Sequence, residues 1–398
     1  MGSHAAVFRC TTYASNEIYK SIGYCLLESD WGSKIIKMGD SVFVKPNLCL
    51  PHKPEEAITT HPIVLEQLIR VLVEVGARIT IGDNPIGKST PGFIEKIWDS
   101  SGVREIAQRY GCKLSMLDGK GFDQKTFELN GKQTSYLISN EYLETDVAVN
   151  VPKLKTHALM GMTGAVKNLY GIIPGRSKVK LHGFAPAVQD FAKVLAQVFS
   201  HRVPEFTVMD GILGLEGDGP GARGVPRAVG ILIVGNDGVL IDSLAAQIIG
   251  FHPRDILTTL EAERLGAGKT SNDFVEWHGV NGLQECAIPD YVKPTTMYRR
   301  SDADTIRKLF EIARFKVEIN TELCDACKKC RQNCPIGAIK RVKRGHDELR
   351  IEQTACVQCL CCLEVCPSGA VNVQRNRFYD QLKKLKEAKG DFKCRRTA

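Results

Sequence analysis

Nine of the fifteen cysteines of this 398-residue chain lie between Cys324 and Cys366, and their spacing repeats. The first four positions of the series return 32 residues later, and so do a proline, a glycine and an alanine that follow them. Short apolar runs typical of strands flank each half, at Val317–Asn320, Ile339–Val342, Leu349–Glu352 and Val371–Gln374. The pattern predicts a small unit built from two equivalent halves. A cysteine count this high favours metal binding over a disulfide framework in a reducing compartment.

Each half reads C-x2-C-x2-C-x3-C-P, which resembles the bacterial two-cluster ferredoxins. The resemblance implies two 4Fe–4S clusters with crossed ligation. One cluster would take Cys324, Cys327, Cys330 and Cys366, and the other Cys356, Cys359, Cys362 and Cys334. Zinc sites built from C-x2-C pairs lack the third spaced cysteine and the C-P step. Cys361 falls outside the repeat, so we expect it to be a packing residue.

The longer part of the chain, residues 5–295, alternates β-branched apolar runs with amphipathic helical stretches. The clearest helix is expected at Pro62–Val75, with a proline at its first position and Gly76 as its stop. Other helices are expected at Pro186–Phe199 and Val239–Ile249. Strands are expected at Ala6–Cys10, Ser41–Val44, Arg78–Ile81, Asp146–Val151, Glu205–Met209 and Ala228–Val234. The pattern predicts an α/β fold with a mostly parallel sheet and helices on both faces.

The expected domain order is therefore simple. Residues 5–295 form the α/β domain, 296–315 a linker helix, 316–374 a small α+β ferredoxin-like domain, and 375–398 a basic tail. The tail accounts for most of the net charge of +8, since residues 371–398 hold nine Lys/Arg against three Asp/Glu. The rest is nearly neutral, which argues against nucleic-acid binding. No apolar run reaches the roughly 20 residues that span a bilayer, and we expect a cytoplasmic protein that does not bind a membrane.

Reactive side chains gather just after the predicted strands. Since the carboxyl ends of strands line the ligand crevice of an open α/β sheet, these residues are expected to converge there. Lys45, Asn47, Lys153, Lys167 and Asn168 would bind a small anionic substrate. Lys155, Asp83, His157 and His182 would be catalytic, with the histidines moving protons. Cys49 is the one isolated cysteine near this chemistry, and a metal among Asp83, Asp210 and Asp242 stays open.

Several motifs of this domain are similar to those of a known family. They are Lys45-Pro46-Asn47-Leu48, Thr59-Thr60-His61-Pro62, Gly82-Asp83-Asn84-Pro85, Val151–His157, Gly164–Gly171 and Glu216–Pro220. They resemble the motif series of the domain of unknown function 362 family, whose members often carry a ferredoxin domain. The resemblance implies an oxidoreductase-like role and names no substrate.

Two phosphate-binding patterns also occur. Gly219–Gly224 fits G-x-G-x-x-G but precedes a strand-like run, so a nicotinamide site is not expected there. Gly82–Ser89 fits G-x-x-x-x-G-K-[ST] after a predicted strand, although Pro85 removes a backbone N–H that should hold phosphate. Nucleotide binding by this loop is kept as an alternative.

The leading hypothesis is an iron–sulfur reductase. Single electrons from an external donor, a ferredoxin or a reductase, would pass through the two clusters to an anionic and unsaturated small molecule in the α/β domain. The first alternative is a non-catalytic electron carrier or assembly factor that docks a redox partner. The second is an ATP-coupled electron-transfer protein that uses the Gly82–Ser89 loop.

Overall fold

The computed structural model describes residues 2–85, 90–271, 274–296, 315–344 and 346–375. The expected linker helix and basic tail fall almost entirely outside these ranges, as does the Ile86–Ser89 part of the nucleotide-type loop. Among the described helices, none is long and apolar enough to cross a membrane.

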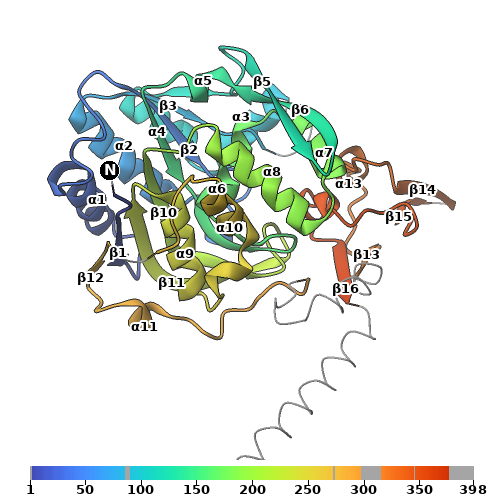
Figure 1. Ribbon diagram of the computed structural model, residues 1–398. Helices are drawn as coiled ribbons and strands as arrows, with labels where there is room; N and C mark the ends of the chain where they lie inside the picture. Colours follow the sequence, from blue (N-terminus) through green and yellow to red (C-terminus); the bar gives the residue numbers. More distant parts are fainter. Residues whose placement is uncertain (1, 86–89, 272–273, 297–314, 345, 376–398) are drawn as a thin grey trace, which may run out of the picture.

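A large sheet of ten strands forms the centre of the molecule (Figure 1). Its main path runs β12-β1-β11-β10-β7-β2-β3-β4, and β8 joins it beside β10 with β9 at its edge. The pairs from β10 through β7, β2 and β3 to β4 are all parallel, whereas β11 is antiparallel to both of its neighbours. The strands are β1 (Ala5–Arg9), β2 (Ser41–Pro46), β3 (Arg78–Gly82), β4 (Lys113–Ser115), β7 (Val147–Val151), β8 (Lys153–His157), β9 (Gly161–Thr163), β10 (Phe206–Gly217), β11 (Gly224–Gly235) and β12 (Val275–His278). The mostly parallel sheet is as predicted.

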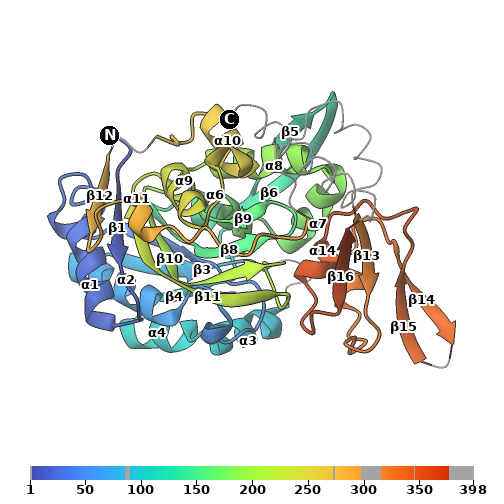
Figure 2. The ribbon, with the colours of Figure 1, turned by 90° about the horizontal axis from the view of Figure 1, so that it is seen from below.

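Helices cover both faces of this sheet (Figure 2). Alternate strand residues point to opposite faces, so Val42 and Val44 pack in one apolar cluster and Phe43 in another. The first face carries α1 (Ser15–Gly23), α2 (Pro62–Val75), α3 (Pro91–Ser100) and α4 (Val103–Tyr110). The second carries α6 (Ala165–Asn168), α8 (Val188–Ser200), α9 (Gly238–Ile248) and α10 (Leu257–Arg264). Helix α2 has the predicted bounds and ends at Gly76, whose φ of 83° is left-handed.

Some elements have no counterpart in the sequence predictions. An antiparallel hairpin of β5 (Phe122–Leu129) and β6 (Lys132–Ser139) stands beside the large sheet. Strand β8 was expected only as site residues, and β9, which pairs with it, was not expected at all. The short helices α5 (Asn140–Leu143), α7 (Gly175–Phe184) and α11 (Leu283–Cys286) also belong to this part.

The C-terminal unit shows the sequence repeat as structure. Strand β13 (Phe315–Ile319) pairs with β16 (Val371–Arg375), and β14 (Ile339–Arg344) pairs with β15 (His346–Ile351). The helical turns α13 (Lys329–Gln332) and α14 (Cys361–Glu364) are 32 residues apart. Left-handed backbone positions repeat at the same offset, as at Ala326 and Gln358 or Lys328 and Leu360. Such conformations are costly for residues other than glycine, so their recurrence indicates one loop shape used twice.

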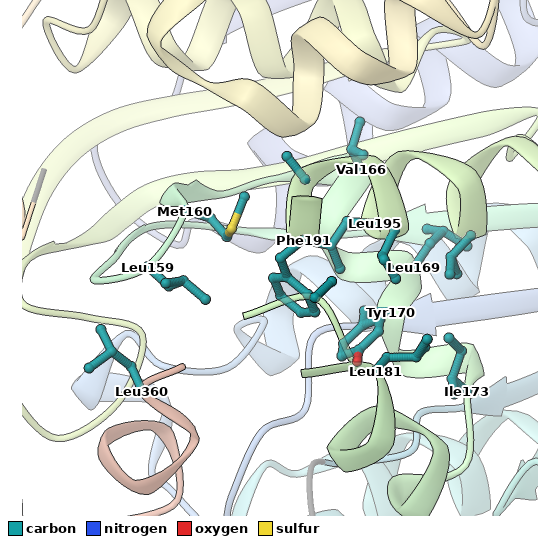
Figure 3. Packing of buried hydrophobic residues seen from close by; sticks show 14 of the residues in the cluster. Leu159, Met160, Val166, Leu169, Tyr170, Ile173, Leu181, Phe191, Leu195 and Leu360 are labelled. Carbon is teal, nitrogen blue, oxygen red and sulfur yellow. The ribbon is translucent and has the colours of Figure 1, made fainter. Parts of the chain in front are cut away.

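The two units share a hydrophobic core. One apolar cluster contains Leu159, Met160 and Tyr170 of the large unit together with Leu360 and Leu363 of the C-terminal unit. Figure 3 shows part of this cluster, with Leu360 on the side of Leu159 and Met160. The C-terminal unit lies at one end of the large sheet, next to α7 (Figure 2).

Candidate functional site

The eight repeat cysteines form two groups, and each group mixes the two halves. A small cavity is bordered by Cys334 and by Cys356, Cys359 and Cys362. The thiol of Cys330 interacts electrostatically with Cys366, Cys327 and Cys324. Apart from Cys361, which also borders the cavity, the grouping is that of the two ligand sets implied by the resemblance, and their binding of clusters stays a prediction. Cys362 also interacts with Cys330, which brings the two groups close together.

Backbone N–H groups point at these sulfur atoms in a repeated manner. The amide of Ala338 donates to Cys334 Sγ at 3.2 Å, and that of Ala370 donates to Cys366 Sγ at 3.2 Å. A thiolate bound to iron keeps negative charge on sulfur, which such donors stabilise. Across the described residues, no three His, Cys, Asp or Glu side chains are grouped as the ligands of a metal ion. A single ion needs sulfur atoms about 2.3 Å from one point, whereas the ligands of a cluster stand further apart. The grouped thiols and the amides that donate to their sulfur atoms are the kind of donor set that holds an iron–sulfur cluster.

A second cavity lies where strands β2 and β3 of the large unit end. Five of the predicted site residues line it, namely Asn47, Asp83, Lys155, Lys167 and Asn168. They share it with residues that the sequence predictions did not include, among them Thr163, Tyr170, Lys178, Pro220 and Glu364. Glu364 belongs to the C-terminal unit and stands between Cys362 and Cys366 in the chain. We call this cavity the anion pocket, because three lysines border it.

Lys155 lies at the inner wall of the anion pocket and is fully buried. Its Nζ donates to Asn47 Oδ1 at 2.7 Å, to the Ile58 carbonyl at 2.7 Å and to Cys49 Sγ at 3.3 Å. Burial lowers the pKa of Lys155, and the charge of Cys49 opposes that shift. Asn47 in turn donates to Asn168 Oδ1 at 2.8 Å. The two predicted asparagines thus belong to one hydrogen-bond network with Lys155.

Asp83 is fixed on the opposite side of the same network. Its carboxylate pairs with Lys45 Nζ at 2.8 Å and accepts the Leu48 amide at 2.7 Å. A Cβ at Gly171 would overlap both Asp83 and Lys45, so only glycine allows this close approach. Lys45 is buried and its positive charge is matched by Asp83, which leaves it behind the pocket wall.

Two other lysines of the anion pocket are not matched by a carboxylate. Lys178 of α7 is buried, and its Nζ donates to the Asn84 carbonyl. Burial lowers the pKa of Lys178 to about 7, with Asp83 acting in the opposite direction. The Lys167 side chain forms no ion pair with a carboxylate of the described residues, but its charge is the largest of the causes that lower the pKa of Glu364. Lys178 was missed because the Arg176–His182 stretch shows no apolar pattern, although its basic composition was a visible signal.

His157 connects the large unit to the C-terminal unit. Its Nδ1 accepts the amides of Leu159 at 3.1 Å and Met160 at 3.2 Å, so in the neutral ring the proton sits on Nε2. That Nε2 lies 3.0 Å from Glu364 Oε1. Burial lowers the pKa of His157 to about 4, so the ring is neutral near pH 7 and its close contact with Glu364 is not a pair of two full charges. The signal for Glu364 was the asymmetry of the repeat, where the first half has Gln332.

Lys153 and His182 were expected in the pocket, but neither is among the residues that line it. Lys153 pairs with Asp210 at 2.7 Å, and both side chains are fully buried. His182 packs against Phe191 with ring centroids 4.1 Å apart. Burial lowers the pKa of His182 to about 3, and neither ring nitrogen has a hydrogen-bond partner among the described residues. Both residues belong to the core around the site.

Comparison with family models matches residues 42–247 to the domain of unknown function DUF362. That is about half of the chain. The chain belongs to the DUF362 family. Residues 323–370 match the 4Fe-4S dicluster domain, so this DUF362 protein carries a ferredoxin-type iron–sulfur domain.

Two individual proteins are similar to this chain, one in sequence and one in structure. The thylakoid-associated protein sll1697 of Synechocystis sp. is 29% identical over 275 residues, which cover 69% of this chain and 83% of that protein. Among solved structures, the lactate racemase apoprotein of Thermoanaerobacterium thermosaccharolyticum aligns with a TM-score of 0.36 and 11% identity. That alignment covers 57% of this chain and 54% of the racemase, so this chain spans about half of the length of the racemase.

Two further motifs of the DUF362 region can be located in the structure. Asp242 accepts the amides of Ala165 at 2.5 Å and Val166 at 3.0 Å, which fixes the start of the helix that carries Lys167. Burial raises the pKa of Asp242 to about 7. The Gly219–Gly224 loop precedes β11, as expected, and faces the C-terminal unit, since a Cβ at Gly221 would lie 3.5 Å from the Glu364 carbonyl. This motif therefore contributes to the contact between the two units.

Proposed function

We propose that the protein is an iron–sulfur oxidoreductase that reduces a small anionic, unsaturated molecule in the anion pocket. Two 4Fe–4S clusters would be held by the cysteine sets described above, and each would supply one electron at a time. The observation that carries the proposal is the position of Glu364. It lines the anion pocket and is separated by one residue from Cys362, a ligand of one set, and from Cys366, a ligand of the other.

The charges of the pocket support an anionic substrate. Asp83 is neutralised by Lys45, which leaves Glu364 as the one other carboxylate among the described residues of the pocket lining, so the three lysines Lys155, Lys167 and Lys178 are in excess. Buried charges are normally paired, so three cations at one cavity favour a ligand with one or two negative charges. Lys167 would bind the carboxylate or phosphate group, while Asn47 and Asn168 hold Lys155 in place.

The proton that accompanies each electron must come from a group near the substrate. Neither His157, whose Nε2 lies 3.0 Å from Glu364, nor His182 is among the residues that line the pocket. Lys178 borders the pocket with a pKa of about 7, close to the value that suits a general acid at neutral pH. We therefore assign the proton donor role to Lys178 in place of the two histidines.

The test uses anaerobically reconstituted full-length protein, reduced with dithionite and freed of excess reductant. Fumarate, maleate and acrylate are then added, and cluster re-oxidation is followed by visible absorbance. If the protein is an enzyme, one of these acids re-oxidises its reduced clusters. Lys167→Ala then slows that re-oxidation while the iron content stays unchanged. Lys120→Ala is the control, since Lys120 is an exposed lysine paired with Glu144.

An electron carrier would give a different result. Its clusters would pass electrons to a protein acceptor such as cytochrome c, with no response to any small acid and no effect of Lys167→Ala. The external donor remains part of the proposal, and the exposed thiol of Cys327 offers it the nearest approach. The ATP-coupled alternative is tested by nucleotide binding with and without Lys88→Ala.

A further inference from the structure

Cys49 is the one thiol of the large unit that lines the anion pocket. It follows β2 by three residues and is partly exposed, whereas Lys155 beside it is fully buried. The three N–H bonds of the Lys155 ammonium are all used, by Asn47, by the Ile58 carbonyl and by Cys49 Sγ. Lys155 therefore has no free donor for a substrate, and Cys49 is the member of this group that a ligand can reach.

Cationic side chains lie around Cys49, and one of them, Lys155, contacts its sulfur. Of the three acceptors of Lys155, the two others are a neutral amide and a neutral carbonyl, so Cys49 alone can carry a counter-charge in contact. Lys45 and Lys178 also act electrostatically on Cys49. A thiolate is the nucleophilic form of cysteine, and nearby ammonium groups favour it.

A second side chain of the pocket indicates a ligand. Thr163 is 3% exposed, and its Oγ1 has no hydrogen-bond partner among the described residues. A buried hydroxyl without a partner costs free energy unless a ligand satisfies it. Thr163 and Lys167 border the same cavity as Cys49 and can both donate to a carboxylate there.

We propose that Cys49 Sγ is a nucleophile that binds a small anionic electrophile covalently, with Lys155 as its positioning residue. The natural ligand class is an α,β-unsaturated carboxylate whose carboxylate binds at Lys167 and Thr163. The sulfur forms a bond to the β-carbon, the double-bond electron pair moves to the α-carbon, and a proton from water completes the adduct. The reverse steps release the ligand unchanged. The anionic preference of the ligand rests on the proposed function, whereas the nucleophilicity of Cys49 does not.

Iodoacetate and iodoacetamide test both parts, because they differ mainly in charge. In each reaction the sulfur bonds to the methylene carbon and iodide leaves with the electron pair. The holoprotein is treated anaerobically with each reagent, and the rate at every cysteine is measured by peptide mass spectrometry. The ratio of the iodoacetate rate to the iodoacetamide rate is normalised to that of 2-mercaptoethanol. A cationic pocket is expected to raise this ratio about tenfold at Cys49. Cys112, a partly exposed thiol outside the pocket, is expected to show no increase.

Variants separate the two contributions. Lys155→Met is expected to slow alkylation of Cys49 by both reagents about tenfold, since it removes the ammonium that contacts sulfur. Lys167→Ala is expected to lower the ratio of the iodoacetate rate to the iodoacetamide rate at Cys49 to that of 2-mercaptoethanol. The wild-type rates alone decide the central point, so a variant that fails to fold does not weaken the test.

The outcomes are distinct. If Cys49 in the wild-type protein reacts no faster than Cys112 with either reagent, the nucleophile proposal is overturned. Rapid reaction with both reagents at the normalised ratio of 2-mercaptoethanol would support the nucleophile and overturn the anionic substrate of the proposed function. A raised ratio at Cys49 supports both.

Discussion

Lys178 should make anion binding dependent on pH. Burial holds its pKa at about 7, so the side chain changes charge across the neutral range. A bound dianion favours the ammonium form and raises that pKa. Near pH 8 about nine tenths of the free protein has neutral Lys178, so binding should take up about 0.9 proton, against about 0.1 proton near pH 6. If only the charged form binds tightly, affinity falls about tenfold between pH 6 and pH 8.

Isothermal titration calorimetry measures this proton uptake directly. Fumarate and sulfate, which do not titrate between pH 6 and 8, are titrated in buffers of different ionisation enthalpy. Lys178→Met should abolish both the uptake and the loss of affinity with pH. Lys180→Met is the matched control, because Lys180 is exposed on the same helix and donates to the Ser135 carbonyl. Equal proton uptake by the wild-type protein and Lys178→Met would refute the assignment, as would an affinity that rises with pH.

Four further predictions follow from named contacts. The pKa of Lys178 in the folded protein lies below the value of 10.5 expected in the unfolded chain, so the free energy of unfolding of the wild-type protein should rise with pH. Lys178→Met lacks this dependence. In urea titrations its stability advantage over the wild-type protein should therefore shrink by about 2 kcal/mol from pH 7 to pH 9. Glu364→Gln removes a negative charge from the anion pocket and should tighten sulfate binding about fivefold by calorimetry, with unchanged iron content. Cys361→Ala should retain all cluster iron, whereas Cys362→Ala should lose about half of it in a ferrozine assay, since only Cys362 belongs to the repeat. Gly171→Ala places a methyl group against Asp83 and Lys45 and should abolish sulfate binding while the iron–sulfur absorbance remains.

The sequence predicts well those parts of the fold that are determined by residues close together in the chain. The ferredoxin repeat depends on cysteine spacing, and its two halves appear in the structure as repeated turns, strands and left-handed residues. Helix α2 has Pro62 and Gly76 as local start and stop signals. The apolar strands β1, β2, β3 and β7 are recognisable because both of their faces are buried.

The parts that it misses depend on partners distant in the chain. Strand β8 is buried at all five positions, although it contains two lysines and a histidine. Charged side chains are rarely buried without a partner, so from the sequence alone these residues are expected at an exposed polar site. The partner of Lys153 is Asp210, and that of His157 is Glu364 from the other unit. Neither pairing has a local signature, and Lys178 enters the pocket only through the placement of α7.

Strand β8 also explains how the pocket and the iron–sulfur unit are joined. Lys153, Lys155 and His157 alternate along the strand, so their side chains share one face at intervals of about 7 Å. The row begins at a buried ion pair in the large unit, passes Cys49 in the anion pocket and ends at Glu364 beside the cluster cysteines. A shift of one residue in register would turn all three side chains to the opposite face. One strand therefore sets both the position of Lys155 beside Cys49 and that of His157 beside Glu364. A substitution at the interface between the units should accordingly shift Lys155 in the anion pocket.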